Sequence, residues 1–337
     1  MRDQKIAGFS FFCACLVVFI HLPLGEPAAG SILCWFRELF VRGFCQIAVP
    51  FFFVVSGFFL GKKAHEIGWW KTAVKKRFSS LVLPYMLWCL IYFLFVHLMI
   101  LCANFVAHRA LSANMFAGGY IGTLKSFWGL DLSELPALIP LWYIRALVLF
   151  VILSPVCVWL LKRYARILIL FTFAVGVVLD FVFAIDSPMG RFFHFGFPVW
   201  GLLYFEVGLL LAIGDKVLVN RMIAAFSYIA ALALLAAGVA FDSNQFGHVL
   251  CKHALRPCLL LSLWYFWPFG NVRGDAFALF ILHPIIITIL KFFVPQILST
   301  WMVPIYSLVV ILCSLAVSSM MRKCMPKLSL ILFGGRS

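Results

Sequence analysis

Residues 6–23 of the chain read IAGFSFFCACLVVFIHLP, and this stretch decides the fold. It is almost wholly apolar until His21 near its far end, and a transmembrane helix needs about 20 mainly apolar residues. An ionisable ring at the end of such a helix is costly in a membrane, so it marks a candidate site of chemistry. We therefore expect the rest of the chain to form a membrane bundle built around this helix end.

The composition of the whole chain supports the same interpretation. Of its 337 residues, 65% are hydrophobic and only 12% are charged, and the mean hydropathy is +1.08. Soluble domains carry about 45–50% apolar and about 25% charged residues, so the sequence predicts an integral membrane protein. The 38 phenylalanines and 11 tryptophans suit lipid-facing helix surfaces and interfacial belts.

Other classes fit the sequence poorly. The net charge of +15 comes from basic residues in short loops between apolar segments, where membrane topology places them, so no nucleic-acid partner is expected. The 11 cysteines lack metal-type spacing, and we interpret those in apolar stretches as small buried hydrophobic residues. No small-residue cleavage site closely follows His21, so we expect the first stretch not to be a cleaved signal peptide.

About ten stretches are predicted to span the membrane. They cover residues 6–24, 43–60, 79–103, 139–161, 165–185, 195–213, 222–241, 254–269, 275–294 and 303–321. The eighth is the shortest and contains Pro257 and Pro268, so we expect it to be broken or misplaced. With the N-terminus inside, most of the 27 Lys and Arg residues lie in inner segments, which predicts that both termini are cytoplasmic. The expected fold is an all-α transmembrane bundle, a single domain over residues 1–337 in the inner (cytoplasmic) membrane.

Two connections between the predicted helices are distinctive. The inner connection 64–77 contains a tryptophan pair and ends in Lys75, Lys76 and Arg77. It is either a topology anchor at the interface or a docking site for a polyanion, such as the phosphates of a nucleotide-like donor. The outer connection, about 104–140, is long enough to cover the bundle as a lid or a short helix.

Few ionisable residues fall within the predicted spans, and each is a functional hypothesis because burying a charge in lipid is costly. They are His21, Arg145, Glu206 and His283, with Arg42 and Asp180 near span ends. For His21, a general base and a histidine hydrogen-bonded at the interface are both open. Arg145 either snorkels to the outer surface or pairs with an anion near His21.

Glu206 and His283 also have two interpretations each. Glu206 either holds a proton, binds an acceptor hydroxyl or pairs with Arg145, or it is a neutral acid bonded to a neighbouring helix. His283 precedes Pro284, whose ring frees a backbone carbonyl one turn back, so a structural role is open beside a functional one. The sequence has no serine elbow, nucleotide-binding loop or His/Glu metal motif, and no metal site is expected.

Four motifs follow His21 along the chain. They are AVPFFFVVSGFFL (48–60), KKRFSSLVLPYMLW (75–88), PLWYIRALVLFVILSP (140–155) and FALFILHPII (277–286). In the first, the small residues Ser56 and Gly57 permit close helix approach. In this order, with His21 before them, the motifs resemble the acyltransferase-3 family of integral membrane acyltransferases. Its bacterial members O-acylate sugars and other extracytoplasmic acceptors.

The resemblance implies a reaction and a set of site residues. Acyl-CoA, usually acetyl-CoA, would be a cytoplasmic co-substrate with no tightly bound cofactor, and the acceptor would be a cell-envelope glycan or lipid-linked sugar. His21 would be the essential catalytic base, and Lys75, Lys76 and Arg77 would hold the donor. The residues expected to bind the substrates are Arg42, Ser56, Arg145, Glu206 and His283.

Two positions depart from the family pattern. Many members carry an arginine where this chain has Ser10, and the second place of a common Arg-x-x-Arg pair is Ser80 here. Both departures put donor handling in doubt and leave open a divergent or impaired member.

The expected mechanism has a geometric difficulty. His21 lies roughly 20 Å from the inner end of its helix, so a donor bound inside would reach it through a passage beside Ser56 and Gly57. His21 would take the acceptor proton, and Arg145 or Arg42 would stabilise negative charge. Two rival functions remain: a transporter or exporter of a polysaccharide or small metabolite, and a non-catalytic membrane sensor.

Overall fold

The computed structural model describes residues 2–22, 31–106, 125, 128–132, 134–214, 221–240, 246–267, 274–293 and 303–335, and all regular structure in these ranges is helical. The longer helices are α1 (Arg2–His21), α3 (Ala48–Gly61), α4 (Trp69–Arg77), α5 (Leu83–Val106), α7 (Trp142–Val182), α9 (Val199–Ile213), α10 (Arg221–Ala240), α11 (Phe246–Phe266), α12 (Ala276–Phe293) and α13 (Val303–Cys324). The shorter segments are α2 (Ile32–Trp35), α8 (Pro188–Arg191), α14 (Pro326–Leu332), 3₁₀ turns at Phe44–Ile47 and Ile139–Leu141, and π-helical turns at Phe36–Val41, Phe78–Val82 and Phe192–Gly196. The predicted all-α fold is confirmed.

Six of the described helical segments are long and apolar enough to cross a membrane, and two shorter apolar helices lie at Arg221–Ala237 and Ala276–Lys291. The protein is therefore a multi-pass membrane protein. The total number of spans and the side on which the termini lie stay predictions. Much of the outer connection, residues 107–124, lies outside the described residues, so its predicted lid is not observed.

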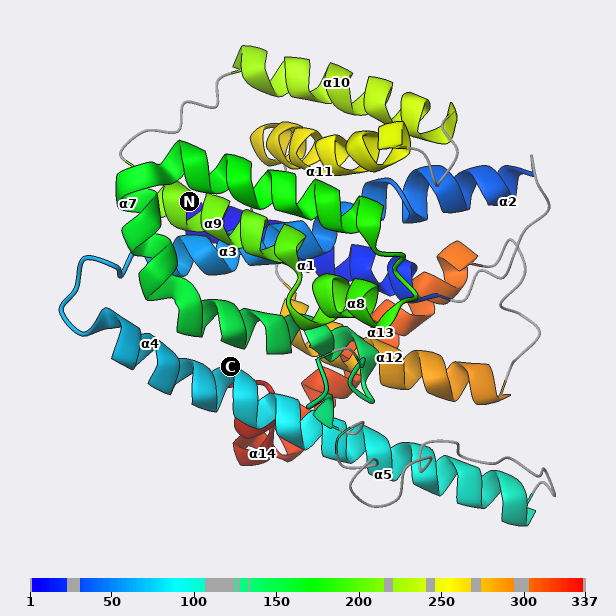
Figure 1. Cartoon of the computed structure of the whole chain (residues 1–337). Helices are drawn as coiled ribbons and strands as arrows, with labels where there is room; N and C mark the ends of the chain where they lie inside the picture. The colour runs from blue at the N-terminus through cyan, green and yellow to red at the C-terminus, as the bar shows by residue number, and fades with distance from the viewer. Residues whose placement is uncertain are drawn as a thin grey trace.

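Helix α7 contains two of the predicted spans. The candidate span Ile139–Val182 has 44 residues, which corresponds to about 66 Å of helix and more than twice the thickness of a bilayer core. Its backbone leaves helical geometry at Tyr164 (φ −137°, ψ 38°), and Figure 1 shows α7 folding back on itself. Tyr164 lies between the predicted spans 139–161 and 165–185, so the sequence correctly located both arms.

Helix α11 differs from the prediction for the eighth span. The helix begins at Phe246, well before the predicted start at residue 254, and it continues through Pro257 without a break. The expectation of a broken helix is therefore wrong for residues 246–266. The added turns include polar residues that resemble a loop in sequence, but His253 finds a buried partner, the carboxylate of Asp180 on α7, at 2.5 Å. That contact makes a polar stretch compatible with a packed helix.

Helices α3 and α9 form the closest contact between two long helices in the bundle. A Cβ atom at Gly57 would collide with the backbone carbonyl of Phe205, and one at Gly208 would collide with that of Val54. The expectation that Gly57 permits close helix approach is confirmed. This contact fixes α3, and with it Ser56, beside the core.

Helix α1, which contains most of the stretch 6–23, lies inside the bundle. Helix α1 contacts α3, α12 and α13, and its side chains Phe9, Cys13 and Val18 are fully buried. Figure 1 shows α10 and α11 side by side along one edge of the molecule and α5 at the opposite edge. The end of α1 is thus surrounded by helices from distant parts of the chain.

Candidate functional site

Two histidines from opposite ends of the sequence meet inside the bundle. The ring of His21, at the end of α1, lies with its centroid 5.3 Å from that of His283 on α12. His283 is fully buried, whereas His21 is half-buried. The structure therefore brings together two of the residues proposed from the sequence.

The surroundings of His283 fix the position of its proton. Its Nδ1 lies 3.0 Å from the carbonyl oxygen of Leu279, and a carbonyl can only accept, so Nδ1 carries the hydrogen. The carbonyl of Phe280, which Pro284 cannot engage, lies beside the same ring. The buried Nε2 has no hydrogen-bond partner among the described residues. In the neutral ring this nitrogen is an acceptor next to His21.

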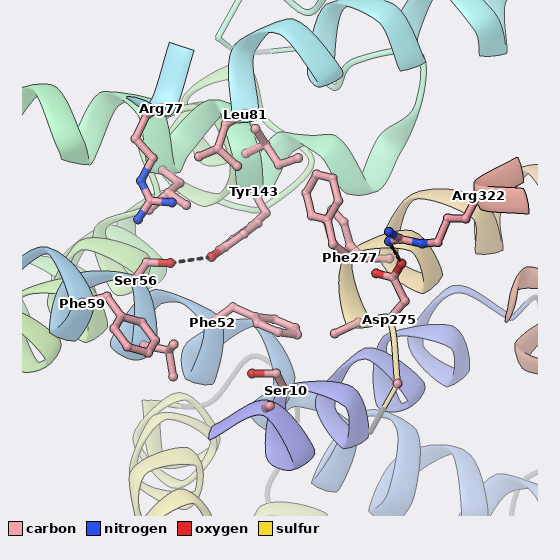
Figure 2. A pocket seen from close by; sticks show the side chains of 17 residues that line it. Ser10, Phe52, Ser56, Phe59, Arg77, Leu81, Tyr143, Asp275, Phe277 and Arg322 are labelled. Atoms are coloured by element: carbon pink, nitrogen blue, oxygen red, sulfur yellow. Dashed lines mark hydrogen bonds and ion pairs between the residues drawn. The ribbon is translucent and has the colours of Figure 1, made fainter. Parts of the chain in front are cut away.

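A cavity of about 790 Å³ opens at the end of the bundle where α1 begins. Its walls come from α1, α3, α4, α7, α12 and α13 and from the π-helical turn after Arg77. Most lining residues are apolar. The polar ones, which Figure 2 shows, are Ser10, Ser56, Arg77, Tyr143, Asp275 and Arg322. Ser56 and Arg77, both proposed from the sequence, thus share one cavity.

Two contacts order the polar side of this cavity. The hydroxyl groups of Ser56 and Tyr143 are 3.1 Å apart, which joins α3 to α7. Arg322 of α13 donates to the carboxylate of Asp275, just before α12. Ser10 is turned inward along its own helix, since its hydroxyl donates to the carbonyl of Ile6 at 2.7 Å.

The cavity ends close to the histidine pair. Phe280 lines its wall, and the Phe280 ring lies 5.9 Å from the Tyr143 ring on one side and 6.3 Å from the His283 ring on the other. Phe280 and His283 are one turn apart on α12. The Phe280 ring therefore links the cavity wall to the histidine pair.

Arg145 lies elsewhere. Its guanidinium donates to the backbone carbonyls of Gly129, Asp131, Glu134 and Phe195. These hydrogen bonds of Arg145 do not go to Glu206 or His21. Arg145 thereby joins the chain segment before α7 to the π-helical turn Phe192–Gly196, which leads into α9.

The remaining proposed residues also lie away from the histidine pair. Arg42 is exposed, with Nη1 2.9 Å from the Glu38 carboxylate. Glu206 is buried on α9 and accepts a hydrogen bond from Thr172 of α7, whereas its Oε2 has no hydrogen-bond partner among the described residues. Lys75 and Lys76 are exposed on α4, next to the cavity residue Arg77 but not in its lining.

The sequence analysis missed Tyr143, Asp275 and Arg322. In the sequence, Arg322 and Asp275 look like ordinary charges at the ends of apolar segments. They are 47 positions apart, so only the packing of α12 against α13 shows that they pair. Tyr143 lies in the motif of residues 140–155, but a tyrosine within an apolar helix is common, whereas the charged Arg145 beside it is not. Among the described residues, no cluster of His, Cys, Asp and Glu could hold a metal ion.

A second polar cluster joins α7, α9 and α11. The Asp180 carboxylate accepts from His253 at 2.5 Å and from the Trp200 indole at 3.1 Å, and Nε2 of His194 lies 3.2 Å from its other oxygen. The His253 ring is stacked on Trp200 with centroids 3.6 Å apart. The Arg256 guanidinium lies 3.4 Å from the other nitrogen of His253. Arg256 Nε has no hydrogen-bond partner among the described residues, but the contacts of Asp180 tie three segments together, so we interpret the cluster as structural.

Comparisons with known proteins agree with the motifs. A family model described as an acyltransferase domain matches residues 8–321. The chain is also similar to the succinoglycan biosynthesis protein ExoH of Rhizobium meliloti (strain 1021), with 24% identity over 170 residues. That alignment covers 48% of this chain and 44% of ExoH, so the chain matches less than half of its relative's length. No solved structure gives a significant match.

Proposed function

The chain belongs to the acyltransferase-3 family, and from this premise we propose that it moves an acyl group from acyl-CoA to a hydroxyl of a cell-envelope glycan. The proposed acyl group is acetyl, and the donor binds from the cytoplasmic side. The protein lies in the inner membrane. Family membership makes the protein a membrane acyltransferase. The donor, the acceptor and the roles of single residues are the proposal.

The observation that supports it is the placement of the cavity relative to His21 and His283. A donor in the cavity has its anionic end near Arg77, and its thioester reaches the histidines if Tyr143 and Phe280 move apart. The depth from Ser10 to His21 is about 16 Å along α1. A long, thin pantetheine arm suits such a path, which removes the difficulty of a base far from the donor's phosphates.

The chemistry then needs one proton transfer and one substitution. His21 takes the proton of the acceptor hydroxyl as the oxygen attacks the thioester carbonyl, forming the new C–O bond. The C–S bond breaks, and the leaving thiolate of CoA takes the proton back from His21. His283, whose Nε2 is an acceptor, binds and orients a hydroxyl or the imidazole of His21. The base contributes a rate factor of about 10²–10⁴.

The donor end uses the basic last turn of α4. Arg77 lines the cavity, and Lys75 and Lys76 lie beside it on the exposed face of α4, where they attract phosphate groups. Ser56 holds Tyr143 at the cavity wall. We assign no contact with the reacting atoms to Arg145, Arg42 or Glu206, because each has a structural partner elsewhere.

The glycan acceptor is inferred from the relative. The name of ExoH places that protein in the biosynthesis of succinoglycan, a polysaccharide. A hydroxyl-rich acceptor of this class provides the group that His21 would deprotonate. Cells with and without the protein should therefore differ by an acyl group on an envelope glycan, which mass spectrometry of the isolated glycans measures.

The test of the site is His21→Ala. We expect acyl transfer to the glycan to fall below detection while the variant inserts into the membrane and keeps the wild-type thermal midpoint. The matched control is His65→Ala, which removes an exposed histidine of the 64–77 connection and leaves transfer unchanged. Transfer at the wild-type rate by His21→Ala would exclude this residue as the base.

A further inference from the structure

Arg322 lines the cavity at a place far from Arg77. Figure 2 shows the two arginines on opposite sides of the space, with Ser56 and Tyr143 near the first and Asp275 beside the second. Arg77 comes from the end of α4 and Arg322 from the last turns of α13. Helices that are far apart in sequence therefore bring two guanidinium groups to one cavity.

The guanidinium of Arg322 is held in place before any ligand arrives. It donates to the Asp275 carboxylate, which also accepts from Ser318 at 3.3 Å and from the backbone N–H of Ala278 at 3.0 Å. On its other side it lies over the ring of Phe333, 5.2 Å from the centroid, and that ring is fully buried. A charged group held in this way loses little conformational entropy when it binds a ligand.

A purely stabilising role does not account for this arrangement. The side chains of Arg322 and Asp275 are 24% and 21% exposed, so the pair is in contact with solvent in the cavity. Partly solvated ion pairs contribute little to stability, of the order of 0–1 kcal/mol. The same partial exposure makes the guanidinium accessible to an anion.

The charges around the cavity define the class of ligand. Two arginines and one carboxylate line it, so its net charge is positive. Guanidinium groups match the oxygens of phosphates, and one arginine has enough donors to hold a carboxylate and a phosphate together. Groups at opposite walls suit a ligand with phosphates at separated positions, as in a nucleotide with a diphosphate and a further phosphate.

We propose that Arg322 binds a phosphate of the nucleotide part of the donor, on the wall opposite Arg77, and that Asp275 is the positioning residue that holds it there. This inference rests on the proposed function. It identifies a second point of attachment for the donor, on the last long helix of the chain.

The test measures the thermal stabilisation of the purified full-length protein by CoA and by pantetheine, which lacks the nucleotide and its phosphates. We expect Arg322→Ala to raise the apparent Kd for CoA at least tenfold and to leave that for pantetheine within twofold. The matched control is Lys323→Ala, which removes the same charge from the next, exposed position of α13 outside the cavity lining. It should leave both values within twofold.

A second variant guards against loss of folding, since removing one partner leaves Asp275 without its counter-charge. The double variant Arg322→Gln, Asp275→Asn removes both charges and should show the same selective loss of CoA affinity. Unchanged CoA affinity in either folded variant, or an equal loss in Lys323→Ala, overturns the role of Arg322 and leaves the acyltransferase proposal standing. Wild-type protein that is not stabilised by CoA overturns both.

Discussion

At the residue scale, the two histidines have unequal surroundings. His283 is fully buried and donates from Nδ1 to the Leu279 carbonyl, so its orientation is fixed. His21 is half-buried at the end of its helix, where an acceptor can approach it. This difference supports His21 as the group that exchanges protons and His283 as the group that orients.

The orienting role of His283 is tested by His283→Asn. The new amide can still donate toward the Leu279 carbonyl, but it has no basic nitrogen to face His21. We expect acyl transfer to fall at least tenfold at an unchanged Kd for CoA, with a thermal midpoint close to that of the wild type. Full activity of His283→Asn, together with unfolding of His283→Ala, would show that this histidine serves only to satisfy the helix backbone.

Four of the residues proposed from the sequence lie together in the structure, and their roles stay predictions. His21, Ser56, Arg77 and His283 all lie at the histidine pair or in the cavity. The roles of Arg145 and Glu206 were harder to predict. The sequence shows that each is ionisable, but not that backbone carbonyls bind Arg145 and that a neighbouring hydroxyl binds Glu206. Arg322 could not be found, because the helix packing that pairs it with Asp275 joins distant segments.

At the scale of elements, the contact between α3 and α9 decides how the cavity is held. The glycines at this contact leave no room for a side chain, so the two backbones touch. Ser56 is the residue before Gly57, and its bond to Tyr143 depends on where α3 lies. The position of the cavity wall thus follows from a backbone contact on the other face of the same helix.

Gly208→Ala should therefore act on the cavity from outside it. The added methyl group would meet the Val54 carbonyl and force the helices apart, at a cost of roughly 1–3 kcal/mol. We expect a lower thermal midpoint and weaker stabilisation by CoA. Gly214→Ala, at the end of the same helix, is the control, because the nearest atom to its Cβ is the Leu210 carbonyl oxygen at 3.1 Å. Equal midpoints for the two variants would contradict the packing argument.

The sequence also predicted most elements, and its error at α11 has a physical cause. Apolar length identified the two arms of α7 on either side of Tyr164. The start of α11 was misplaced because Lys252 and His253 lower the hydropathy of its first turns. A polar helix turn is stable there only because Asp180 lies opposite, and hydropathy along one segment contains no information about another.

At the scale of the whole molecule, the Asp180 cluster fastens the α10–α11 pair to the rest of the bundle. Helices α10 and α11 pack mainly on each other along one edge (Figure 1). The carboxylate of Asp180 connects α11 to α7 and, through Trp200, to α9. The cluster is remote from the cavity lining, so stability and donor binding can be separated by experiment.

The variant Asp180→Asn should change the stability of the protein without changing donor binding. A neutral amide replaces the carboxylate that accepts hydrogen bonds from His253 and Trp200, and the loss is roughly 1–3 kcal/mol. We expect a lower thermal midpoint and faster hydrogen exchange in α11, while the Kd for CoA stays within twofold. The control, Asp186→Asn, alters an exposed carboxylate on the following turn and should change neither quantity. Weaker CoA binding by Asp180→Asn would mean that this edge of the molecule is coupled to the donor site.

The wall formed by Tyr143 and Phe280 has an electrical consequence. A membrane protein with a cavity inside its helix bundle must not become a leak for protons or salt. The Tyr143 and Phe280 rings meet edge to face, and the Tyr143 hydroxyl is already hydrogen-bonded to Ser56, so this part of the wall presents mainly ring carbons, which cannot replace the hydration shell of an ion. A wall of this kind resists the passage of hydrated ions through the bundle.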